Sequence, residues 1–181
     1  MTESTTNPPT VAVGECASDF PLWAAKEALK AAETALLETD KSRESIAKTA
    51  TSLIGWALPL SVVFGGVVFA QTLGSPQRMA AAAGFLLTTA AALEAFQALR
   101  IRVWANTGLQ PSQWLGLIET PPPEASALYI TVERLKSLDN ALHINHQRIE
   151  ICAKHVRHAW VLLMAMPAVA FMAALLVAII V

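Results

Sequence analysis

The stretch TSLIGWALPLSVVFGGVVFA, residues 51–70, contains no charged side chain over 20 consecutive positions. A helix of this length, rising about 1.5 Å per residue, spans roughly the 30 Å hydrocarbon core of a bilayer. Because lipid offers no hydrogen bonds, a backbone that crosses it must satisfy its own, and a single segment can do so only as a helix. We therefore expect a transmembrane helix here, and this expectation constrains the rest of the chain.

Two further segments have a similar character. Residues 79–99 are rich in alanine and contain one ionisable side chain, Glu94, whereas residues 159–181 are uncharged. Hydrophobic residues make up 54% of the chain and charged residues 15%, a balance that is unusual for a soluble protein. Since only eight residues, 71–78, join the first two segments, a membrane hairpin is favoured over a soluble one. The sequence predicts three transmembrane helices.

The basic residues are distributed unevenly around these segments. Twelve of the thirteen Lys and Arg residues lie before residue 51 or between residues 100 and 158, and only Arg78 lies in the 71–78 loop. The positive-inside rule then places the N-terminus and residues 100–158 in the cytoplasm, with the 71–78 loop and the C-terminus outside. The first 18 residues are polar and lack the apolar core of a signal peptide, so we expect a disordered cytoplasmic tail.

Two heptad-like patterns precede the first and third spans. In residues 19–50, Leu22, Leu29 and Leu36 recur every seven residues and predict an amphipathic helix. In residues 124–158 a longer heptad row is made by Leu128, Leu135, Leu142, Ile149 and Val156, with a partner row of Leu138, Asn145, Cys152 and Ala159. Nothing in the sequence breaks either helix before the span that follows it, so we expect both to continue into the membrane.

These patterns lead to a predicted fold class. We expect an all-α membrane protein with three transmembrane helices and a cytoplasmic two-helix coiled-coil-like stalk, paired within one chain or between chains. The insert of residues 100–123 contains Gly108, Pro111 and three consecutive prolines, which predict irregular structure. Asn145 lies on the predicted seam, where a polar residue can fix register or oligomeric state. The narrow seams and rows of small residues favour a homo-oligomer.

No pattern typical of catalysis is present. The chain has no Gly-rich phosphate loop outside the spans, no nucleophile elbow and no zinc-binding Cys pair, so we expect a protein that is not an enzyme. Its basic residues are not interleaved with aromatic ones, so we expect no nucleic-acid partner. Glu94 is a functional candidate because ionisable residues are rare within spans. The alternative is that Glu94 pairs with Arg100 or Arg102 near the cytoplasmic end.

All four histidines and one cysteine lie within residues 142–160: His143, His146, Cys152, His155 and His158. On one helix these side chains spread over about 240°, and the first and last are about 22 Å apart along the axis. One helix therefore cannot converge them on one metal ion, and we predict a solvated helix surface with no metal site. A site completed by a symmetric oligomer and a pH-sensitive interface are the alternatives.

The order of elements resembles that of a known class of bacterial membrane proteins. The motif residues are Asp40 and Lys41 in ETDKSRESIAKTA, and Asn145 followed nine positions later by Lys154. Over residues 20–181 the chain resembles the Pycsar transmembrane effectors of anti-phage defence and the related SLATT-type membrane domains. The resemblance implies assembly in the bacterial inner membrane on a cyclic-nucleotide signal, with loss of membrane integrity. We assign no binding residue on the basis of this resemblance.

A cyclic pyrimidine nucleotide, made by a neighbouring cyclase, is the activating ligand that this resemblance implies, and no other cofactor is expected. Since the sequence contains no separate nucleotide-binding module, the ligand would contact the stalk or a subunit interface near Arg134, Lys136, Arg148 or Lys154. Two other functions remain open. The chain could be a structural anchor or scaffold that acts through its stalk, or a small channel subunit with Glu94 in the conduction path.

Overall fold

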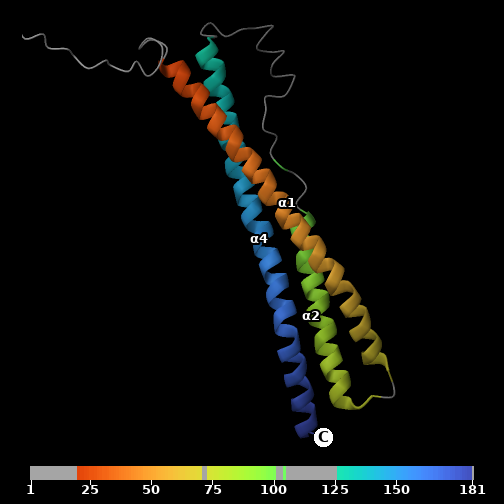
Figure 1. Ribbon diagram of the computed structural model, residues 1–181. Coiled ribbons are helices and arrows are strands. Elements are labelled where there is room, and N and C mark those ends of the chain that lie inside the picture. Colours follow the sequence, from red (N-terminus) through yellow and green to blue (C-terminus); the bar gives the residue numbers. More distant parts are fainter. Residues whose placement is uncertain (1–19, 71–72, 101–103, 105–125, 181) are drawn as a thin grey trace, which may run out of the picture. The chain divides into compact units, whose positions relative to one another are not determined.

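The computed structural model describes residues 20–70, 73–100, 104 and 126–180, and these residues form three helices (Figure 1). They are α1 (Phe20–Phe69), α2 (Ser75–Arg100) and α4 (Ala127–Ile180). Each helix is long and apolar enough to cross a membrane. The all-helical class and the three membrane-length apolar helices are therefore confirmed, and the fold is compatible with a multi-pass membrane protein.

The two long helices each join an amphipathic segment to an apolar one without a break. α1 covers the predicted helix before the first span as well as that span, and α4 does the same for the third. Pro59 and Pro167 lie inside these helices without ending them. α4 begins after Ser126, whose hydroxyl accepts a hydrogen bond of 3.1 Å from the N–H of Tyr129 and so caps the helix. The predicted tail and nearly all of the 100–123 insert lie outside the described residues.

The described chain divides into two units, and the first consists of residues 20–35 of α1 and 126–141 of α4. Only Ala25, Leu138 and Ala141 are buried in this unit. An ion pair of 2.7 Å joins Glu33 to Arg134, but both side chains are nearly half exposed, so it contributes little to stability. Burial this sparse does not establish a coiled coil, and the predicted stalk stays a prediction.

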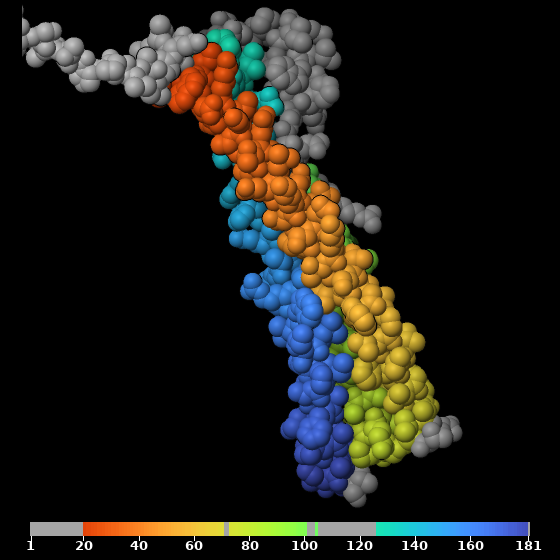
Figure 2. Space-filling view, in the orientation of Figure 1, coloured from red at the N-terminus to blue at the C-terminus, as the bar shows by residue number. Residues whose placement is uncertain are grey.

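The second unit contains the rest of the described chain and most of the buried residues. Here α1 and α4 run in the same direction and α2 runs opposite to both (Figure 1). One face of α2 supplies small buried residues to the core: Ala81, Gly84, Thr88, Ala91, Ala92, Ala95 and Ala98. Small side chains let helix backbones approach closely, which is how helices pack where lipid removes the hydrophobic drive. In the space-filling view α1 and α4 lie against each other, with the start of α2 beside them (Figure 2).

Two phenylalanine rings pack between α1 and α2, each against a glycine of the other helix. A Cβ atom added to Gly84 would lie 3.1 Å from ring atoms of Phe64, and one added to Gly65 would lie 3.4 Å from the ring of Phe85. Each glycine thus leaves room for a phenylalanine of the other helix. Beside them the fully buried Thr88 donates its hydroxyl hydrogen to the carbonyl of Gly84 at 2.8 Å, so no polar group is left unpaired at this position.

The heptad pattern of α4 is present, but its second row is the more deeply buried. Leu138, Asn145, Cys152 and Ala159 are at most 4% exposed, whereas the row of Leu135, Leu142, Ile149 and Val156 is only half-buried. In the second unit the second row packs against α1 and α2 together, forming clusters with Ala50 and Ala98 and with Leu53 and Ala95. Where three helices meet there is room only for small side chains. α4 is therefore rotated so that its second row, rather than the row of larger residues, faces α1 and α2.

Candidate functional site

An acidic and a basic side chain meet between α2 and α4. The Nδ1 atom of His155 lies 2.7 Å from Oε2 of Glu94, and both side chains are one-third exposed. At this distance the two groups share one hydrogen bond, and which of them donates depends on the imidazole tautomer. Ala95 on α2 and Ala159 on α4, each one residue or one turn away, are fully buried. The pair therefore lies at the edge of an apolar cluster, where a lone charge would be costly and a paired one is tolerated.

The sequence did not predict that these two residues would pair. For Glu94 it weighed pairing with Arg100 or Arg102, of which Arg102 lies outside the described residues; the ion pair that the structure describes for Glu94 is with His155. His155 was expected on a solvated surface, yet it faces α2. No sequence signal links the two residues, because they are 61 positions apart on different helices.

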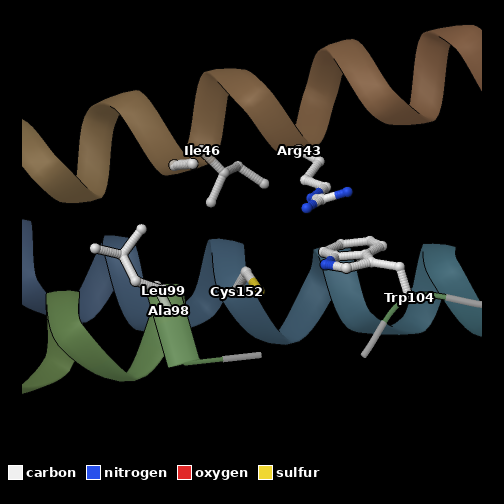
Figure 3. Close-up of a pocket in the computed structure, with 7 residues that line it drawn as sticks. Arg43, Ile46, Ala98, Leu99, Trp104 and Cys152 are labelled. Carbon is white, nitrogen blue, oxygen red and sulfur yellow. The ribbon is translucent and has the colours of Figure 1, made fainter. Parts of the chain in front are cut away.

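A second site is a cavity of about 260 Å³, whose lining includes Cys152, three residues before His155 on α4 (Figure 3). Residues of all three helices line it, together with one residue that follows α2: Arg43, Ile46, Ala47, Ala98, Leu99, Trp104 and Cys152. In Figure 3 the Arg43 side chain descends from α1 toward the Trp104 ring, and the sulfur of Cys152 lies between them and Leu99. The cavity thus combines one cation, one aromatic face and an otherwise apolar lining.

The cation in this cavity is held by an aromatic ring. The guanidinium carbon of Arg43 lies 4.8 Å from the centroid of the Trp104 ring, within the range of a cation–π contact. Burial raises the pKa of the Cys152 thiol, so that side chain stays neutral at physiological pH and is a poor nucleophile. Sequence reasoning assigned no site role to Arg43.

The four predicted ligand residues divide between the two units. Arg134 pairs with Glu33, and Lys136 pairs with Glu133 at 2.8 Å, a contact that raises the pKa of Lys136. Arg148 and Lys154 belong to the second unit. None of the described contacts joins any two of these four residues.

Of that second pair, Lys154 is exposed and Arg148 is half-buried. The Nη1 atom of Arg148 is buried with no hydrogen-bond partner among the described residues. A buried donor without a hydrogen-bond acceptor destabilises a protein by about 1–3 kcal/mol, so a ligand that supplied an acceptor to this nitrogen would be favoured.

Two of the remaining histidines, His143 and His146, each contact a near neighbour on α4. His143 lies 2.9 Å from Gln147, and His146 lies 3.4 Å from Glu150. Within the part of the chain that the structure describes, no three His, Cys, Asp or Glu side chains converge in a way that could hold a metal ion. Asn145 is 4% exposed on the α4 seam, which places it where the register prediction requires a buried polar residue.

Fold and contacts together define the class of this protein: an all-helical chain with three helices able to cross a membrane and an ionisable pair between two of them. No family model, no curated protein and no solved structure matches it.

Proposed function

We propose that this chain is a membrane effector of bacterial anti-phage defence, whose copies assemble in the inner membrane and impair its integrity on a cyclic-nucleotide signal. The observation that carries the proposal is the contact of Glu94 with His155. Ionisable residues among apolar helices are costly, and where they occur they usually serve transport or switching. A passive anchor has no use for such a pair, whereas a protein that changes state in the membrane does.

The exposure of α4 supports assembly. None of the residues in its most apolar 18-residue window is buried in the single chain, whereas a third of the corresponding window of α2 is. α2 is thus the inner helix of the second unit, and the apolar half of α4 faces lipid or other copies. In this proposal the segments 19–50 and 124–158 form the cytoplasmic stalk, and the stalks of different copies contact one another, with the N-terminus inside and the C-terminus outside.

The proposed trigger is a cyclic pyrimidine nucleotide. Its phosphate requires a cation, and of the four predicted ligand residues Arg134 and Lys136 already have carboxylate partners. Arg148, with its unpartnered buried nitrogen, is therefore the strongest of the four, and Lys154 lies further along the same helix.

The test is a measurement of membrane potential in bacterial cells that express this chain with or without a pyrimidine nucleotide cyclase. We expect a voltage-sensitive dye to report depolarisation, followed by growth arrest, only when both proteins are present. Glu94→Gln should reduce the effect without removing the protein from the membrane fraction. Intact potential in cells that contain both the protein and the nucleotide would contradict the proposal. A lack of affinity of the purified protein for cyclic UMP and cyclic CMP would remove the trigger.

The same Glu94–His155 contact also favours a second candidate, a small constitutive channel subunit with Glu94 in its path. It predicts ion flux in vesicles that contain no nucleotide, and Glu94→Gln should alter that flux while leaving assembly unchanged. If forced assembly of the protein produces neither toxicity nor ion leak, the result would favour the structural anchor over both other functions.

A further inference from the structure

The cavity beside Arg43 has the donors, the lining and the position of a site for a phosphate group. We propose that it binds the phosphate of a membrane lipid headgroup or of a small soluble phosphate ester, just before the first predicted span at residue 51. This inference rests on the cavity itself and stands whether or not the protein is a defence effector.

None of the hydrogen bonds that the structure describes uses the donors of Arg43. A guanidinium that stacks on an aromatic ring uses its face, while its N–H groups lie in its plane and point outward from the edge. Those edge donors form the planar fork that matches two oxygens of a phosphate. None of the ion pairs that the structure describes involves Arg43, so no carboxylate among the described residues competes for this fork.

A second basic residue, Arg148, is not one of the residues that line the cavity, but it lies on α4 one turn before the lining residue Cys152. Arg148 precedes Cys152 by four residues, so the two share one face of the helix and are about 6 Å apart along its axis. Long side chains on a helix commonly lean toward its N-terminus, and Trp104 lies in that direction from Cys152 in Figure 3. The buried Nη1 atom has no acceptor among the described residues, and an anion held by Arg43 would supply one.

The depth of the cavity fits a headgroup. Ala47 lies four residues before the first candidate span and Arg43 eight, so these levels are about 6 and 12 Å from its start. The polar headgroup layer extends about 5–8 Å beyond the hydrocarbon core, so it includes the level of Ala47, and the backbone of Arg43 lies just outside it. Ile46 and Leu99 offer apolar surface on the side nearer the spans, where an acyl chain or a glycerol backbone would lie. Basic pockets between helices at this level are typical sites for anionic lipids.

The experiment compares phosphate-containing ligands with phosphate-free matches, using the full-length chain. In one arm, native mass spectrometry of the protein in mixed micelles measures retention of phosphatidylglycerol against diacylglycerol. In the other, calorimetry in detergent measures glycerol phosphate against glycerol. Retention of phosphatidylglycerol alone identifies a lipid headgroup, and binding of glycerol phosphate identifies a soluble ester as well. If neither ligand binds better than its match, the proposal is overturned.

Variants locate the binding. Arg43→Gln should weaken the preferred ligand about tenfold or more, as expected for loss of a charged hydrogen bond. Lys41→Gln removes the same charge from an exposed position two residues away and should leave binding unchanged. On α4, Arg148→Gln should weaken binding, and Arg157→Gln serves as the exposed control. Equal effects of the cavity and control variants would overturn the site even if the ligand binds, and Arg148→Gln keeps the test decisive if Arg43→Gln fails to fold.

Discussion

Replacing Gly84 by valine tests the packing of α1 against α2 directly. A Cβ at this position would already lie 3.1 Å from three ring atoms of Phe64, which is closer than carbon atoms normally approach. The two γ-methyl groups of valine extend further, so the ring or the helix must move. Gly66→Val is the matched control, because a Cβ added to Gly66 meets nothing within 4 Å and the residue also lies inside a helix.

The expected size of the effect is the difference in free energy of unfolding between the Gly84→Val and Gly66→Val proteins. Both substitutions replace a helical glycine by the same side chain, so the change in helix propensity cancels between them. The remaining difference is the cost of overpacking, about 1–3 kcal/mol in the free energy of unfolding. That corresponds to roughly a 5- to 150-fold change in the unfolding equilibrium constant. An SDS titration in mixed micelles, followed by tryptophan fluorescence, measures it.

A second substitution shows whether the ring is the cause. Phe64→Ala removes the atoms that a valine at position 84 would contact, so Gly84→Val should cost little in that background. Equal stability of the Gly84→Val and Gly66→Val proteins would refute the packing of these two helices. An undiminished cost of Gly84→Val in the Phe64→Ala background would show that the clash lies elsewhere.

Three other predictions concern single side chains. Glu33→Gln should change the free energy of unfolding by less than about 1 kcal/mol in a thermal unfolding assay, because Glu33 and Arg134 are both nearly half exposed. In a Cys16→Ser background, alkylation of Cys152 should accelerate only at a higher pH than for a free cysteine, because burial raises the thiol pKa and the thiolate is the reactive form; a profile like that of a free cysteine would contradict this. Asn145→Leu should yield more than one oligomeric species on crosslinking, whereas an unchanged single species would remove its role in register.

The sequence was sufficient to predict the helices because their signals are local. An uncharged stretch such as residues 51–70 has one stable form in lipid, and its helix follows without knowledge of any partner. Continuity of α1 and α4 through their apolar parts followed from the absence of a breaker, and Pro59 and Pro167 did not overrule it. The heptad period of α4 was likewise readable, since it depends on spacing alone.

Contacts between helices were not predictable in the same way. A period fixes which residues share a face, but not how far the helix turns about its own axis to meet two neighbours. Val156 was placed at the centre of the seam, whereas the fully buried residue at this level is Ala159, because α1 and α2 converge there. The same rotation brings His155 from the predicted solvated surface to Glu94. Arg43 gave no signal, because a single arginine among other charged residues has no motif until Trp104 is placed beside it.

The contacts within the second unit also bear on where a bilayer would lie. The cluster of Ala50, Ala98 and Cys152 puts the predicted start of the first span and the predicted end of the second at one level. On α4 that level is Cys152, seven residues or about 10 Å before the third predicted span at residue 159. The three boundaries therefore cannot lie in one plane.

A bilayer that begins at residue 159 instead would lie level with Leu53 and Ala91, which share a cluster with Ala159. It would leave α1 and α2 about 24 Å or less of apolar length each, which is short of a typical 30 Å core. A bilayer that begins at the level of Cys152 takes His155 and its partner Glu94 below the surface. There the 2.7 Å contact between them satisfies both groups, while exposed basic side chains such as Arg157 reach back to the headgroups. In a bilayer placed at that level, the pairing of Glu94 with His155 would allow α4 to insert as deeply as the other two helices.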